Sequence, residues 1–252
     1  MLGLWVKRIQ VRFQPGLLPS IVVTLLLPLL VGLGFWQLDR AQEKEALKAR
    51  FQTTQTQRPI KPEALTHEPN PAFVRVQLTG HFDENQSYLL DSRTRNGIAG
   101  VELLQPFFDQ KTQRWFLVNR GWLAWPDRTT APHFSTPKEL ISISAWVYVP
   151  TGEPFVLKEQ TTQIGDATVV SALRPQTLWE ALKRTGYRYE MRLEPSPYAL
   201  DTHWPQTRFN ANTHRGYALQ WFSLATALVA LFIYFGLHHA RENNNEPSLS
   251  RT

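Results

Sequence analysis

The sequence predicts an α+β membrane protein in which two transmembrane helices flank a strand-dominated, antiparallel and barrel-like extramembrane domain. Two observations carry this prediction. Residues 16–36 and 216–237 contain no charged side chain, and each run is long enough to cross a hydrocarbon core of about 30 Å as a helix. The stretch between them holds short apolar and β-branched runs separated by Asn, Gly and Pro, which is typical of a sheet that curls or closes.

The first apolar run follows the basic residues Lys7, Arg8 and Arg12, as the core of a signal peptide does. It is longer than a signal-peptide core and no A-x-A cleavage pattern follows it, so we interpret it as an uncleaved anchor. A buried helix of a soluble core is the other alternative, but such helices are usually shorter and keep a polar face. Pro28 predicts a kink in this span rather than a break.

The predicted layout is a basic tail (1–15), a transmembrane helix (16–38), an extramembrane domain (39–215), a second transmembrane helix (216–237) and a polar tail (238–252). Two spans place both termini on the same side of the membrane. The amino tail has three basic residues and no acidic one, which favours the cytoplasm. We therefore expect a bacterial inner-membrane protein with cytoplasmic termini and a periplasmic domain. The first helix is expected to continue past its span, because residues 37–52 have helical composition.

Within the domain, strands are expected at 74–79, 87–90, 101–108, 115–122, 140–149, 155–157, 167–170 and 189–193. Gly80 is expected to end the first of them. One helix is expected at 175–186, with Pro175 in its first turn, Leu178 and Leu182 on its apolar face and Gly186 as its stop.

The composition excludes several function classes. The net charge is +6, and the domain contributes only half of it, with 22 basic and 19 acidic residues over 177 positions; so dilute a charge does not indicate nucleic-acid binding. The absence of cysteine excludes disulfides, thiolate metal sites and covalent haem attachment through C-x-x-C-H. No G-x-S-x-G, phosphate loop or H-E-x-x-H is present. Asp201-x-His203 is the nearest approach to a metal pair, and we interpret it as surface hydrogen bonding. We therefore expect no enzyme.

The remaining residues that could bind a cofactor lie at the borders of the two predicted membrane spans. His214, Tyr217, Ala218 and Trp221 share one helix face. Histidine is a common axial ligand of haem iron, Ala218 leaves space beside it, and the two aromatic rings suit a flat macrocycle. The ordinary alternative is a polar flank with interfacial aromatic residues, and the residues alone favour that alternative.

The end of the first span contributes Trp36, Gln37 and Arg40 at the same membrane border. In a two-helix hairpin these residues would lie near His214, where Arg40 would reach a carboxylate such as a haem propionate. A lipid headgroup contact is the ordinary role for Arg40.

Three motifs resemble those of one family. The segment Gly34-Phe35-Trp36-Gln37-x-x-Arg40 resembles the G-x-W-Q-x-x-R entry motif of the surfeit locus protein (Surf/Shy-type) family, which assembles haem–copper cytochrome oxidase. The block V-N-R-G-W at 118–122 and the element H-x-x-Y-A-x-x-W at 214–221 resemble two further family motifs. Arg215 departs from the family pattern and suggests that the second helix starts after it. The similarity extends over residues 30–238.

The resemblance implies an inner-membrane assembly factor that holds or presents haem a while oxidase subunit I matures, with subunit I, haem a synthase and membrane lipid as partners. The cofactor-binding candidates are His214 as ligand of the haem iron, Tyr217, Trp221, Arg40 and Trp36. The structural or docking candidates are Gly34, Gln37, Arg120, Gly121 and Trp122. No other metal site is expected.

Two other functions remain as alternatives. One is a haem-independent chaperone or scaffold that stabilises an oxidase subunit interface. The other is a membrane-anchored periplasmic hydrolase, which ranks last because no nucleophile–base pair is found. For the Arg120-Gly121-Trp122 turn, a structural role is favoured over substrate contact: Gly121 permits a positive φ at a strand end, Trp122 packs beneath the sheet, and Arg120 caps backbone groups or pairs with a carboxylate.

Overall fold

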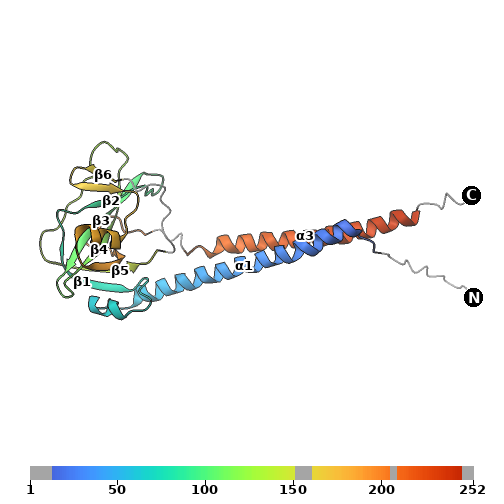
Figure 1. The fold of residues 1–252 in the computed structure, drawn as a ribbon, viewed down its shortest axis with the longest axis horizontal. Coiled ribbons are helices and arrows are strands. Elements are labelled where there is room, and N and C mark those ends of the chain that lie inside the picture. Colours follow the sequence, from blue (N-terminus) through green and yellow to red (C-terminus); the bar gives the residue numbers. More distant parts are fainter. Residues whose placement is uncertain (1–12, 151–160, 205–208, 246–252) are drawn as a thin grey trace, which may run out of the picture. The chain divides into compact units, whose positions relative to one another are not determined.

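The computed structural model describes residues 13–150, 161–204 and 209–245, and it divides into two compact units (Figure 1). One unit comprises residues 1–48 and 206–252 and contains the two long helices. The other comprises residues 49–205 and contains the strands.

The helical unit is an antiparallel pair of α1 (Leu17–Thr56) and α3 (Ala211–Asn245). Both helices contain a stretch long and apolar enough to cross a membrane, and only 6% and 11% of these stretches is buried. So little burial is unlike the core helix of a soluble protein. α1 is one continuous helix through Pro28 and past residue 38, which confirms the predicted extension.

Small residues line the seam between α1 and α3. Gly34 and Ala41 are buried on α1, and Ala218 and Ala225 are buried on α3. A methyl group on Gly34 would lie 2.5 Å from the ring of Phe222, so glycine is required there for the backbones to approach. These positions recur every seven residues on each helix, and on α1 the buried Gln37 lies between them; this is the pattern of helices that pack along a common seam.

The strand unit is built on a five-stranded barrel. Its strands are β1 (Arg75–Phe82), β3 (Gly100–Asp109), β4 (Arg114–Ala124), β5 (Ile141–Tyr148) and β8 (Gly186–Leu193). They pair in the order β1-β5-β8-β4-β3, and a pairing between β1 and β3 closes the ring. Apolar side chains from all these strands fill the core, among them Val76, Leu78, Phe107, Val118, Ile143, Met191 and Leu193. The predicted strand-rich, barrel-like domain is confirmed.

The sheet continues outward from β3 through β2 (Tyr88–Leu90), β7 (Ala167–Val170) and β6 (Thr161–Ile164). Helix α2 (Pro175–Leu182) packs Leu178 and Trp179 on the outer face of this part of the sheet. The predicted antiparallel arrangement holds for most strand pairs, but β4–β8 and β2–β7 are parallel pairs. Each parallel pair joins strands that are far apart in sequence, as parallel pairing requires.

Several predicted boundaries also differ. β1 runs through Gly80 to Phe82, because Gly80 is the residue that pairs with both β5 and β3 and closes the barrel. α2 ends at Leu182, where Lys183 adopts a left-handed conformation, and Gly186 begins β8 instead of stopping a helix. The strand β6 and the short 3-10 helix η1 (Pro62–His67) were not expected. The strand expected at 155–157 lies outside the described residues.

Candidate functional site

His214 lies in the first turn of α3 and faces α1 across the seam. Its Nδ1 is 2.8 Å from Oε1 of Gln37, a buried residue of α1. An amide oxygen can only accept a hydrogen bond, so we assign a proton to Nδ1 of His214. In the neutral ring this proton leaves the lone pair on Nε2, which has no hydrogen-bond partner among the described residues. Metal-bound histidines are commonly oriented by such a bond from their other ring nitrogen.

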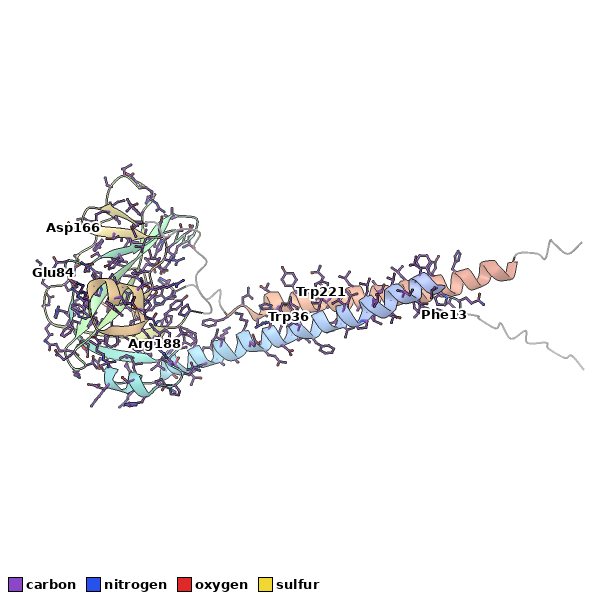
Figure 2. All side chains as sticks on the ribbon, viewed as in Figure 1. Phe13, Trp36, Glu84, Asp166, Arg188 and Trp221 are labelled. Atoms are coloured by element: carbon purple, nitrogen blue, oxygen red, sulfur yellow. The ribbon has the colours of Figure 1, made fainter. Side chains whose placement is uncertain are left out.

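The neighbours of His214 on α3 divide between the seam and the outer surface. Ala218 is buried in the seam, Trp221 is half-buried, and Tyr217 is 50% exposed. Trp36 on α1 is similarly exposed, at 49%, and Figure 2 shows Trp36 and Trp221 on their two helices. Three aromatic side chains on the two helices, those of Trp36, Tyr217 and Trp221, are therefore partly or largely exposed.

The basic residues near His214 have partners on the same surface. Arg40 pairs with Glu43 at 2.7 Å and lies over the ring of Trp36 at 5.7 Å. The Arg40–Glu43 pair is solvent-exposed and therefore weak. Of the three α1 residues expected near His214, the structure shows a contact for Gln37.

Arg215 does not delay the start of α3. The helix begins at Ala211, so His214 is helical, and Arg215 points outward to an ion pair with Glu45 at 2.5 Å. The expectation that the helix starts after Arg215 is wrong, because an exposed residue in the first turn is compatible with a packed seam.

The residues around His214 suit a metal ion that a cofactor already coordinates, because such an ion takes few ligands from the protein. Among the described residues no group of three His, Cys, Asp or Glu side chains is able to hold a bare ion. The seam offers one oriented imidazole nitrogen. A macrocycle-bound iron, which needs only axial ligands from protein, matches that donor set.

The Arg120-Gly121-Trp122 segment is not a turn but a β-bulge inside β4. Leu103 pairs with Gly121 while the next residue of β3 pairs with Asn119, so Arg120 is the extra residue. Gly121 has a φ of 121°, and a methyl group there would lie 2.7 Å from the carbonyl oxygen of Asp201. The predicted positive φ is confirmed, although it occurs within a strand.

Arg120 is buried and binds oxygen atoms from three segments. Its Nη1 donates to Oε1 of Gln105 at 2.7 Å and to the carbonyl of Ser135 at 2.9 Å, and its Nε donates to the carbonyl of Tyr198 at 2.9 Å. Burial lowers the pKa of this guanidinium to about 10. The predicted capping role is confirmed. Trp122 donates from Nε1 to the carbonyl of Arg93 at 2.6 Å, which anchors the end of the bulge.

A model of the SURF1 family matches residues 24–226. The chain belongs to the SURF1 family. The match covers most of the chain, and it confirms the resemblance drawn from the three motifs.

Individual relatives agree with this membership. Cytochrome oxidase assembly protein SHY1 of Saccharomyces cerevisiae is 34% identical over 114 residues, which span 42% of this chain and 29% of SHY1. SURF1-like proteins are similar over most of their length. That of Rickettsia bellii is 27% identical over 224 residues, 84% of this chain and 88% of its own. That of Monosiga brevicollis is 26% identical over 229 residues, 81% and 82% of the two chains.

The SURF1-family barrel also carries a polar network that the sequence reasoning missed. Nδ2 of Asn119 donates to Oε2 of Glu102 at 2.9 Å and to Oε1 of Glu190 at 3.0 Å. Nε of Arg192 donates to the same Glu190 oxygen at 3.1 Å. Burial raises the pKa of Glu190. The available signal was a glutamate in the mostly apolar β3, Glu102, and another between two arginines in β8, Glu190.

The interpretation of Asp201-x-His203 as surface hydrogen bonding is confirmed. Nδ1 of His203 lies 2.7 Å from Oδ1 of Asp201, and the His203 side chain is almost fully exposed.

Proposed function

We propose that this chain is an inner-membrane assembly factor for haem–copper cytochrome oxidase, and that it holds haem a through His214 while subunit I matures. Membership in the SURF1 family and the named role of the yeast relative SHY1 support the assembly role. Subunit I and haem a synthase are the proposed partners, and the role proposed is not enzymatic.

The hydrogen bond between Gln37 and His214 carries the proposal for haem. It fixes the imidazole as an Nδ1–H tautomer, so Nε2 is the atom that would bind iron. The seam holds the ring in place because Gln37 is buried and cannot turn away. A single ligand from this chain suits transient binding, since a haem held by two strong protein ligands would be released too slowly to pass on.

The proposed orientation places both termini in the cytoplasm and the strand-rich domain in the periplasm. The basic amino tail supports this orientation, and two helices of sufficient length and apolarity support the two spans. Reporter fusions at each terminus test it, and a periplasmic reporter that is active at the carboxyl end would overturn it.

The direct test of the function is purification of the full chain after co-expression with haem a synthesis. The wild-type protein is expected to show a Soret band, and His214→Ala is expected to lose it. His203→Ala is the matched control, because His203 is exposed on the domain surface and should leave the band unchanged. Circular dichroism of each variant reports whether the fold is retained.

Two outcomes contradict the proposal in different ways. Full retention of haem by a folded His214→Ala protein would show that His214 is not the ligand. A wild-type protein without haem that still supports oxidase assembly would favour the haem-independent scaffold.

A further inference from the structure

An ion pair joins the two long helices beside His214. Nη2 of Arg215, the next residue on α3, lies 2.5 Å from Oε1 of Glu45 on α1. Both side chains are about half exposed, at 53% and 47%. Glu45 follows Gln37, the partner of His214, by eight residues, so it lies about 12 Å farther along α1, on the side away from the apolar run. The guanidinium group of Arg215 is therefore held on the outer surface of the helix pair, at its polar end.

This pair differs from the other arginine pair near His214, that of Arg40 with Glu43. Arg40 binds a residue three positions away on its own helix and lies over the ring of Trp36. Arg215 instead crosses from α3 to α1. The crossing pair therefore places a cation across both helices, at the residue next to the candidate iron ligand.

The carboxylate of Glu45 is easily exchanged for another. An exposed ion pair is weak, so a second carboxylate replaces Glu45 on Arg215 at little cost and with no change in net charge. The planar guanidinium fork matches any carboxylate in geometry and charge. Haem carries carboxylates at one edge of an otherwise apolar macrocycle. Arg215 is thus suited to pair with such a group.

We propose that Arg215 binds a carboxylate of the haem that His214 holds, and that Glu45 pairs with Arg215 when no haem is bound. This inference rests on the proposed function, and it assigns the haem carboxylate to Arg215 instead of Arg40. Glu45 competes for the same guanidinium group, so it lowers the affinity for the haem carboxylate and favours release. Such competition suits a protein that passes its ligand on.

Titration of the full chain in detergent, followed at the Soret band, tests the assignment with two probes. Iron protoporphyrin IX has free carboxylates, and its dimethyl ester has the same ring and iron without the negative charges. The wild-type protein is expected to bind the free acid about threefold more tightly than the ester, the effect of one exposed ion pair. Arg215→Gln is expected to bind both probes equally.

Further variants distinguish this pair from general surface charge. Glu45→Gln removes the competing carboxylate and is expected to raise the preference for the free acid to about tenfold. Lys48→Gln removes an exposed cation of α1 and is expected to leave the threefold preference unchanged. The proposal would be overturned by a wild-type protein without preference, by equal effects of Lys48→Gln and Arg215→Gln, or by a preference that Arg40→Gln abolishes and Arg215→Gln retains.

His214→Ala separates this test from that of the proposed function. Loss of the iron ligand is expected to weaken the binding of acid and ester by the same factor, so the preference for the acid persists. Undiminished binding by His214→Ala, with the preference intact, would contradict ligation by His214 and still support the carboxylate site. Equal binding of acid and ester by the wild type, with weak binding by His214→Ala, would overturn the carboxylate site and support ligation.

Discussion

The barrel and the helical seam both bury polar side chains, but they use them differently. In the barrel, Gln105 is fully engaged: Oε1 accepts from Arg120, and Nε2 donates to Ser87 and Thr136. In the seam, the pair of Gln37 and His214 satisfies one ring nitrogen and leaves the other with no partner among the described residues. A saturated polar group supports the fold, whereas an oriented group with a free lone pair is available for a ligand.

The largest effect is expected when Arg120, the buried cation of the barrel bulge, is replaced. The comparison treats this residue as a support of the fold. Arg120→Leu is expected to lower the free energy of unfolding by about 3 kcal/mol, because Gln105 and two carbonyl oxygens lose their donor inside the protein. Chemical denaturation of the full chain measures this change. Arg114→Leu, at an exposed position of the same strand, is the control. Equal effects of the two substitutions would show that Arg120 is not a structural group.

Adding one methyl group at position 34 tests whether the two helices pack closely along the seam. Gly34→Ala is expected to destabilise the helix pair by about 1–2 kcal/mol, because the new methyl would overlap the ring of Phe222. Gly32→Ala is the matched control, since nothing lies within 4 Å of that position, and it should be neutral or slightly stabilising. Thermal unfolding in detergent compares them. If both variants unfold like the wild type, the helices do not pack through Gly34.

The smallest expected effect is a pH dependence in the barrel network. Burial, opposed by the nearby Arg192, raises the pKa of Glu190 above its ordinary value of 4.5. The native state then holds this proton more tightly than the unfolded chain, so stability falls as the pH rises through the folded pKa. Glu190→Gln removes the titration. Its stability relative to wild type should therefore increase with pH and then level off, and a difference independent of pH would refute this.

The sequence predicts the parts of this molecule that depend on local pattern. The two apolar helices follow from their length and lack of charge, and most barrel strands follow from short apolar runs bounded by Gly, Pro and Asn. The parallel pairs β4–β8 and β2–β7 were missed because each joins distant segments. At Arg120-Gly121-Trp122 the sequence predicts a turn, because a glycine with positive φ is expected at a strand end; the structure has a bulge there, which depends on pairing with β3.

The sequence predicts which segments surround the candidate site, but not which of their residues make contact. The sequence places His214 and the end of the first apolar run at the same membrane border, but it does not determine which residue touches the imidazole. That choice depends on the register of the two helices, which small residues such as Gly34 and Ala218 set through close packing. Gln37, expected to be structural, is the residue that orients His214, and Arg40 instead pairs with Glu43 on its own helix.

The haem a affinity of Gln37 variants tests most directly whether the seam prepares His214 as a ligand. Leucine at position 37 keeps the seam packed but removes the acceptor for Nδ1, whereas glutamate keeps an acceptor and strengthens it. Titration of the purified full chain is expected to show binding about ten- to a hundredfold weaker for Gln37→Leu and at least as tight as wild type for Gln37→Glu. Wild-type affinity in Gln37→Leu would contradict the account.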